Sequence, residues 1–217
     1  TRMSRLSTID GVLQPRLWVF SDEVKRYASV VILIVLVLSY GAGTVYRNSV
    51  WSNGMSLWSD AVAKSPESSL AHTNLGTEYA SLGKSEKATE HFLKALRFSD
   101  PDARTHLANI HYNLGAVYQQ IGRDGMAMSE YKVVAENSPS DFRPHYNLGV
   151  IYQQKGEMEA AVDAYRAALA RNPSDFRSYH NLGLLFQGRG ELSIAEEFYR
   201  KALSLNPDYS RSMFNLA

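Results

Sequence analysis

The strongest constraint on this chain is a 34-residue pattern that returns along the sequence. Segment 142–175 reads FRPHYNLGVIYQQKGEMEAAVDAYRAALARNPSD, and segment 176–209 reads FRSYHNLGLLFQGRGELSIAEEFYRKALSLNPDY. The Asn-Leu-Gly triplet that ends at Gly149 recurs 34 residues later at Gly183 and 34 residues earlier at Gly115. A fixed period of this length predicts structural units that stack on their neighbours, because one such unit cannot bury its own apolar side.

Each copy of the pattern holds the same residue types at the same places. An aromatic residue follows the triplet glycine by three positions, a second glycine follows it by seven, and then come an Ala-x3-aromatic pair and a proline. In chain order these residues are Tyr79, Tyr118, Tyr152 and Phe186; Gly83, Gly122, Gly156 and Gly190; Ala88/Phe92, Ala127/Tyr131, Ala161/Tyr165 and Ala195/Tyr199; and Pro101, Pro139, Pro173 and Pro207. The pattern resembles the tetratricopeptide repeat (TPR), in which each copy is a pair of antiparallel helices. The tryptophan usual in that family is replaced by His72, His111, His145 and Tyr179.

The small residues of the pattern have physical reasons to stand where they do. The first glycine and the alanine let the two helices of a repeat approach closely, and the second glycine ends the first helix in a left-handed conformation. We therefore expect an all-α fold, with a right-handed solenoid made of repeats at 69–102, 108–141, 142–175 and 176–209 and a partial repeat at 210–217. We expect the chain to be part of a longer protein, because it begins at Thr1 and stops inside the partial repeat.

The second repeat departs from the regular spacing. Gly76 and Gly115 are 39 residues apart rather than 34. Four of the five extra residues follow Pro101, which is close to one helical turn. The first helix of this repeat is therefore expected to start one turn early, with Asp100 as its cap and Pro101 at its first position.

A long uncharged stretch precedes the repeats, from Tyr27 to Tyr46, and it contains 20 residues. A helix of 20 residues is about 30 Å long, which matches the apolar core of a bilayer. The sequence therefore predicts a transmembrane helix at 24–46, with a buried helix of a soluble domain as the alternative. The basic residues before the uncharged stretch are Arg2, Arg5, Arg16, Lys25 and Arg26. They favour an integral membrane protein that has 1–23 in the cytoplasm, contacts the lipid bilayer through 24–46 and places its repeats in the periplasm or the ER lumen.

Between this stretch and the repeats, 47–68 is expected to be a linker with a lone packing helix, because Met55–Lys64 is apolar at helical spacing. The order of motifs over 25–75 resembles the transmembrane and TPR-containing proteins, an O-mannosyltransferase-like family, and their bacterial relatives. The residues that carry this resemblance are Arg47, Asn48, Trp51, Leu57, Trp58, Asp60, Lys64, Pro66, Ala71, His72, Asn74, Leu75 and Gly76. The resemblance implies a polytopic, glycosyltransferase-like membrane protein that uses lipid-linked sugars. The catalytic residues of that family lie in an early loop outside this chain, so none is carried over.

Reactive and metal-binding side chains are sparse in the repeats. The chain has no cysteine, which excludes disulfides, thiol nucleophiles and cysteine-based zinc sites. His106 and His111 are five residues apart, so they do not stack on one helix face as a metal-binding pair would. Residues 69–217 hold 16 lysines and arginines against 17 aspartates and glutamates, which argues against nucleic acid as a partner. We therefore predict no catalytic residue, metal site or cofactor in this segment.

A polar stripe recurs on the first helix of each repeat. Its members are Asn74, Asn113, Asn147, Asn181 and Asn215; Tyr112, Tyr146 and His180; Gln119, Gln153 and Gln187; and Arg143 and Arg177. First helices of TPR proteins line a concave groove, so the resemblance implies a groove that holds a protein or an extended peptide through its backbone amides. The alternative is that the asparagines bond a neighbouring helix, and the two roles are compatible. With only two basic residues on the stripe, the carboxylate-clamp pattern of chaperone-binding repeats is not met.

Two functions fit these observations. In the first, the chain is the membrane-anchored C-terminal region of a glycosyltransferase-like protein, and its repeats recruit acceptor proteins by raising their local concentration. In the second, it is a single-pass membrane-anchored scaffold that assembles a protein complex and has no enzymatic activity. Whether the full-length protein is an enzyme stays open at this point.

Overall fold

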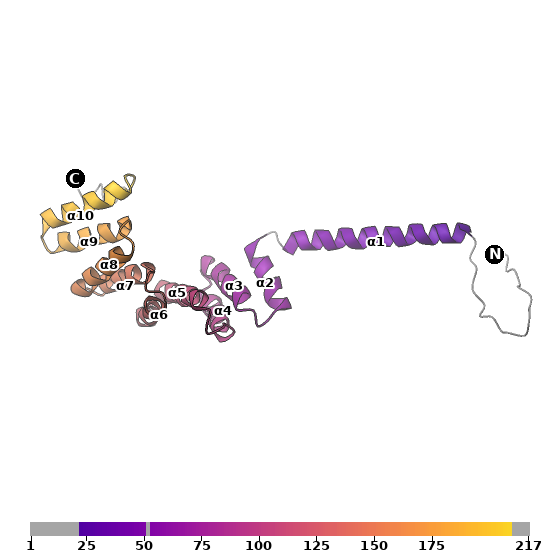
Figure 1. Cartoon of the computed structure of the whole chain (residues 1–217), viewed down its shortest axis with the longest axis horizontal. Coiled ribbons are helices and arrows are strands. Elements are labelled where there is room, and N and C mark those ends of the chain that lie inside the picture. The colour runs from indigo at the N-terminus through magenta and orange to yellow at the C-terminus, as the bar shows by residue number, and fades with distance from the viewer. Residues whose placement is uncertain (1–21, 51–52, 210–217) are drawn as a thin grey trace, which may run out of the picture. The chain divides into compact units, whose positions relative to one another are not determined.

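The computed structural model describes residues 22–50 and 53–209, and every regular element in these residues is a helix. The chain divides into two compact units, Thr1–Trp51 and Ser52–Ala217. The helices are α1 (Asp22–Val50), α2 (Gly54–Lys64), α3 (Ser69–Ser81), α4 (Ser85–Arg97), α5 (Arg104–Gln120), α6 (Asp124–Asn137), α7 (Arg143–Gln154), α8 (Met158–Arg171), α9 (Phe176–Gly188) and α10 (Leu192–Leu205) (Figure 1). The first unit contains α1, and the second contains α2 to α10.

The predicted transmembrane helix at 24–46 is wrong. The helix α1 has 29 residues, but its unbroken apolar run is only Val30–Leu38, with Ser29 and Ser39 on either side. This run of nine residues measures about 14 Å as a helix, against about 30 Å for the apolar core of a bilayer. Among the residues described, 22–50 and 53–209, no helix has the length and apolar character needed to cross a membrane. The integral-membrane localisation that depended on this helix is corrected with it.

The second unit is a row of four helix hairpins, α3/α4, α5/α6, α7/α8 and α9/α10 (Figure 1). The two helices of each hairpin pack against each other, and the second helix of one hairpin packs against the first helix of the next. At the start of the row, α2 packs against α3. The expectation of an all-α helical repeat solenoid is therefore confirmed, because each hairpin completes its core on its neighbours.

The two glycines of a repeat have the separate roles that the sequence predicted. Gly149 lies against the ring of Tyr165, and a Cβ added at Gly149 would come within 2.7 Å of two ring carbons. At Gly156 the backbone has a φ of 76°, in the left-handed region that ends a helix. The same two arrangements recur at Gly76, Gly115 and Gly183, and at Gly83, Gly122 and Gly190.

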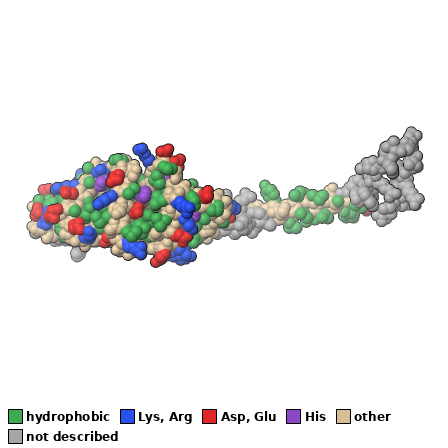
Figure 2. All heavy atoms as spheres, turned by 90° about the horizontal axis from the view of Figure 1, so that it is seen from below, with side chains coloured by type: hydrophobic (Ala, Val, Ile, Leu, Met, Phe, Trp, Pro, Cys, Tyr) green, Lys and Arg blue, Asp and Glu red, His purple; other side chains and the backbone are tan. Residues whose placement is uncertain are grey.

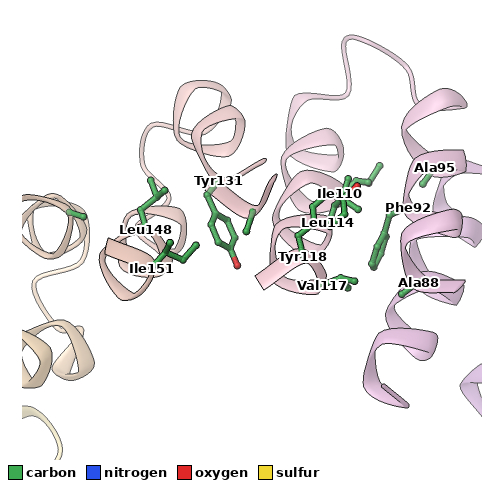
Figure 3. Packing of buried hydrophobic residues seen from close by; sticks show 12 residues of the cluster. Ala88, Phe92, Ala95, Ile110, Leu114, Val117, Tyr118, Tyr131, Leu148 and Ile151 are labelled. Carbon is green, nitrogen blue, oxygen red and sulfur yellow. The ribbon is translucent and has the colours of Figure 1, made fainter. Parts of the chain in front are cut away.

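Aromatic rings of the second helices fill the centre of the row. Phe92 and Tyr131 are fully buried, and each contributes to one core with the apolar side of α5. Figure 3 shows these two rings on either side of α5, with Ile110 and Leu114 between them. The core therefore continues from one hairpin to the next without a break at the repeat boundary.

The second repeat absorbs its extra residues in its first helix. The helix α5 has 17 residues, against 12 or 13 in α3, α7 and α9. The expected cap is wrong, since the N-cap is Ala103, without a side-chain hydrogen bond, and Pro101 lies in the turn before it. Asp100 shapes that turn instead, because its Oδ1 accepts a hydrogen bond from the N–H of Asp102 at 2.9 Å.

Two of the histidines that replace the family's tryptophan contact a polar residue on the second helix of their repeat. His72 Nδ1 lies 2.9 Å from His91 Nδ1, and His111 Nδ1 lies 2.6 Å from Glu130 Oε2. His72 Nε2 is 2.9 Å from the carbonyl oxygen of Pro66, which can only accept. His72 therefore carries its proton on Nε2 and accepts at Nδ1 from His91. Burial, followed by the nearby His72, lowers the pKa of His91, so the neutral form of His91 is favoured.

Candidate functional site

The predicted polar stripe lies on the first helices of the hairpins. We call the following six residues of α5, α7 and α9 the amide face: Asn113, Asn147, Asn181, Gln119, Gln153 and Gln187. Its asparagines are half-buried, as are the first two glutamines, whereas Gln187 is exposed. Asn74 has the same place on α3, where its Nδ2 donates to the Leu70 carbonyl of its own helix at 3.0 Å. Asn215 lies outside the described residues.

Each glutamine of the amide face accepts a hydrogen bond from a buried tyrosine of its own repeat. The tyrosine hydroxyl donates to the glutamine Oε1 in three consecutive repeats. The distances are 3.0 Å for Tyr131 and Gln119, 2.8 Å for Tyr165 and Gln153, and 2.6 Å for Tyr199 and Gln187. The glutamines are thus oriented by the core, because a buried hydroxyl without an acceptor would be costly.

Two asparagines connect their repeat to the preceding one. The Nδ2 of Asn147 donates to the Tyr112 hydroxyl at 3.3 Å, and the Nδ2 of Asn181 donates to the Tyr165 hydroxyl at 3.0 Å. In both pairs the tyrosine belongs to the preceding hairpin, so these bonds cross the repeat boundary. The alternative role considered for the asparagines, bonding a neighbouring helix, is therefore observed at these two positions.

The tyrosines and the histidine three positions before the triplet glycine pack on the buried ring of their own repeat. Ring centroids are 5.8 Å apart for Tyr112 and Tyr131, 5.9 Å for Tyr146 and Tyr165, and 5.6 Å for His180 and Tyr199. Burial raises the pKa of Tyr146, and it raises the pKa of Tyr165 further. Both phenols therefore keep their protons near neutral pH and remain hydrogen-bond donors.

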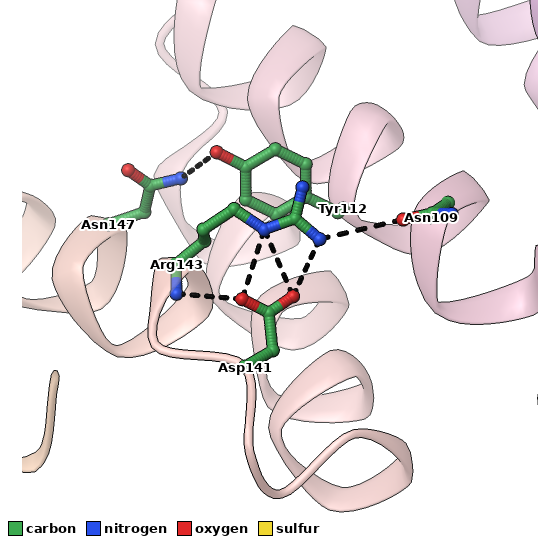
Figure 4. A network of polar contacts seen from close by, with 5 residues as sticks. All are labelled: Asn109, Tyr112, Asp141, Arg143 and Asn147. Carbon is green, nitrogen blue, oxygen red and sulfur yellow. Dashed lines mark hydrogen bonds and ion pairs between the residues drawn. The ribbon is translucent and has the colours of Figure 1, made fainter. Parts of the chain in front are cut away.

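The two arginines of the stripe are held by aspartates. Arg143 Nη2 lies 2.7 Å from Asp141 Oδ2, Arg143 Nε also donates to that carboxylate, and the guanidinium lies 4.5 Å from the centre of the Tyr112 ring (Figure 4). Burial alone would raise the pKa of Asp141, but the hydrogen bonds and charge of Arg143 lower it below its usual value. The same ion pair and ring contact recur in the next repeat. Arg177 Nε lies 3.1 Å from Asp175 Oδ1, and the guanidinium of Arg177 lies 4.8 Å from the centre of the Tyr146 ring. The stripe is therefore close to neutral, in agreement with the missing carboxylate-clamp pattern.

Where a side chain of the amide face forms an internal hydrogen bond, that bond occupies only one side of the amide group. Gln153 is bonded through Oε1 and Asn181 through Nδ2. Within the described part of the chain, no hydrogen bond involves Nε2 of Gln153 or Oδ1 of Asn181. An amide side chain has both a donor and an acceptor. The face therefore presents NH2 donors from glutamines and carbonyl acceptors from asparagines.

Sequence reasoning missed the partners that orient these side chains. The repeat pattern identified Tyr165 only as the aromatic residue of an Ala-x3-aromatic pair, and it did not identify Asp141. A signal for the first was present, because glutamine and tyrosine occur together in three repeats whereas the first repeat has Ala80 and Phe92. A signal for the second was the Asp-x-Arg spacing, which ends at Arg143 and recurs one period later.

Fold and face together define a class of protein: an array of helix hairpins with a polar, nearly neutral surface on its first helices. Segments 142–175 and 176–209 match one family model of the tetratricopeptide repeat, and segment 70–100 matches a second one. The chain therefore contains tetratricopeptide repeats and is a protein–protein interaction module. The hairpin α5/α6, whose first helix carries the extra residues, lies outside the matched segments.

Solved structures of other proteins have the same fold. MamA from Desulfovibrio magneticus RS-1 is 21% identical over 80% of this chain and 95% of its own, with a TM-score of 0.62. YrrB, described as a TPR protein with an unusual peptide-binding site, is 18% identical over 80% of this chain and 87% of its own, with a TM-score of 0.61. The C-terminal part of a TPR protein from Cytophaga hutchinsonii is 15% identical over 82% of this chain and 68% of its own, with a TM-score of 0.67.

At these identities the likeness shows the fold alone. None of the curated proteins matches the chain. The resemblance of 25–75 to the O-mannosyltransferase-like family is not supported by any of the comparisons.

Proposed function

We propose that the repeats bind an extended segment of a partner protein along the amide face, mainly through the backbone of that segment. The observation that carries this proposal is the orientation of the amide groups. Gln153 and its equivalents accept from the core through Oε1, which leaves their NH2 donors for a ligand. Asn147 and Asn181 donate through Nδ2, which leaves their carbonyl acceptors. An extended backbone offers one N–H and one C=O at each residue, so both kinds of group find a complement.

The charge distribution supports a neutral ligand segment. Arg143 and Arg177 are paired with aspartates and stacked on tyrosines, so neither is an unpaired cation. Figure 2 shows acidic and basic side chains interspersed on the face of the repeats in view. We therefore expect binding that depends little on ionic strength and needs no terminal carboxylate. That nucleic acid is not a partner stays a prediction.

The expected affinity is modest for a short peptide. A net hydrogen bond contributes about 0.5–1.5 kcal/mol, so a few such bonds give dissociation constants of about 0.1–10 mM before side-chain contacts add to them. YrrB has this fold and a peptide-binding site, which makes a peptide the natural first probe. A glycosyltransferase context is left out of the proposal, since no comparison supports it.

The test uses substitutions that remove the NH2 donor of a glutamine but keep the oxygen that accepts from the buried tyrosine. Gln153→Glu and Gln187→Glu retain an oxygen for the tyrosine hydroxyl but replace the NH2 donor. Peptides selected from a phage-displayed library of random 12-residue sequences serve as the probe. We expect each substitution to weaken binding about 2- to 10-fold by fluorescence polarisation, the equivalent of one lost hydrogen bond.

The matched control is Gln154→Glu, which introduces the same charge one residue further on α7, at an exposed position. It should leave affinity within about twofold of the original. The proposal is overturned if no peptide is enriched, or if Gln153→Glu and Gln154→Glu have the same effect.

A further inference from the structure

The first repeat lacks the glutamine–tyrosine pair of the other three. Ala80 stands at the glutamine position, four residues after Gly76, and Phe92 stands at the tyrosine position. The Phe92 ring packs on Gly76 as the tyrosine rings pack on the equivalent glycines, since a Cβ added at Gly76 would come within 2.8 Å of a ring carbon. What is missing is the long amide side chain and the hydroxyl that holds it.

A hollow lies where that pair would be. It has a volume of about 110 Å³ and lies between α3, α4 and α5. Ala80, Phe92, Ala116 and Val117 form its apolar lining, and three polar residues, Thr77, Asn113 and Gln120, also border it. Phe92 is fully buried and Val117 is 2% exposed, so these two residues form the floor of the hollow and are held by the core (Figure 3). Thr77, Ala116 and Gln120 are exposed and form its rim.

Asn113 differs from its equivalents in the later repeats. Asn147 and Asn181 donate to tyrosine hydroxyls of the preceding repeat. The first repeat has no such hydroxyl, because Thr73 and Phe92 occupy the two tyrosine positions. Within the described part of the chain, the Asn113 side chain forms no hydrogen bond, so both its donor and its acceptor are available to a ligand.

We propose that this hollow is a side-chain subsite of the peptide-binding face, which takes a branched aliphatic residue of the bound segment. Asn113 would bond the backbone N–H and C=O beside that residue. The inference rests on the proposed function and adds a sequence preference to it. Its occupant follows from size and chemistry: an apolar cavity of about 150 Å³ holds a benzene molecule, so about 110 Å³ suits a leucine, isoleucine or valine side chain. A charged side chain would be disfavoured, since no ionised residue lines the hollow.

The test fills the hollow with the pair that the chain uses elsewhere. The double variant Ala80→Gln/Phe92→Tyr recreates the arrangement seen at Gln153 and Tyr165, so the fold should tolerate it. Peptides from the same 12-residue library are selected on the original protein and on this variant. We expect selection on the original protein to enrich an aliphatic residue at one fixed position, and the preference to disappear with the variant. For one selected peptide, replacing that residue with alanine should weaken binding to the original protein roughly tenfold.

A second measurement addresses the hollow without any selected peptide. N-acetyl-leucinamide and N-acetyl-glycinamide are titrated against methyl-labelled protein and followed by NMR. The leucine compound should shift the Val117 methyl signals of the original protein but not those of the double variant, and the glycine compound should shift neither. Ser81→Gln, on an exposed residue next to Ala80, is the matched control and should behave as the original protein.

The outcomes distinguish a failure of the subsite from a failure of the proposed peptide-binding function. If no peptide binds the original protein, the proposed function fails and the subsite fails with it. If peptides bind and are sensitive to Gln153→Glu, but show no aliphatic preference or keep it in the double variant, only the subsite is overturned.

Discussion

Replacing Tyr165 by phenylalanine should separate hydrogen bonding from packing at the centre of the third repeat. The Tyr165 side chain is fully buried, its hydroxyl donates to Gln153 at 2.8 Å, and it accepts from Asn181 at 3.0 Å. Phenylalanine keeps the ring in place, as Phe92 does in the first repeat. The loss is then confined to two hydrogen bonds between neutral groups, each contributing about 0.5–1.5 kcal/mol, so the unfolding free energy should fall by about 1–3 kcal/mol.

A double-mutant cycle assigns that loss to named bonds. Combining Tyr165→Phe with Gln153→Ala should cost less than the sum of the single changes by about 0.5–1.5 kcal/mol, because both remove the same bond. Urea unfolding followed by circular dichroism gives the four free energies, provided that the m value stays constant across the set. Gln154→Ala, one residue further on, should show no coupling to Tyr165→Phe. A coupling energy below about 0.3 kcal/mol for Gln153 would refute the reasoning, since that is the value for unconnected sites.

The two glycines of a repeat and the histidine pair of the first repeat give two further predictions. Gly149→Ala should destabilise by about 1–3 kcal/mol through overpacking on Tyr165, whereas Gly156→Ala should cost about 1–2 kcal/mol through its positive φ. In urea titrations asparagine should partly rescue only Gly156, so rescue at Gly149 would contradict the packing explanation. Burial and the neighbouring His72 lower the pKa of His91. The stability contributed by the neutral His91 is complete above the unfolded-state pKa of about 6.5 and should therefore decline as the pH falls below that value toward the lower folded-state pKa. In thermal melts between pH 7.5 and 5.5, His91→Glu should reduce this decline, and an equal decline in both proteins would exclude His91 as its cause.

The period of the sequence was sufficient to predict the hairpins and the two glycine roles, because each role depends on one residue and its local geometry. A Cβ at Gly149 would collide with a ring, and the backbone at Gly156 requires a positive φ. Both requirements recur with the 34-residue period, so they are visible in one chain. The polar stripe was also predictable as a set of positions on one side of a helix.

The pairing of side chains across that stripe was not predictable in the same way. A helical period shows which residues share a face, but not which of them meet a residue from another helix. Tyr165 bonds Gln153 in its own repeat and Asn181 in the next, and only the stacking of hairpins brings the three together. The error at α1 has a different origin, because a stretch without charges was taken as an apolar stretch although Val30–Leu38 is its only unbroken apolar run.

The internal bonds also decide how a ligand could meet the amide face. If Asn181 turned its Nδ2 toward a ligand, the hydrogen bond to the Tyr165 hydroxyl would be lost, at a cost comparable to the bond gained. The same holds for the Oε1 of Gln153. A ligand therefore gains most by donating to the asparagines and accepting from the glutamines, which gives the face a fixed order of donors and acceptors. Asn113 is the exception, because no hydrogen bond among the described residues holds its orientation. The ligand residue bound beside the hollow can therefore either donate to Asn113 or accept from it.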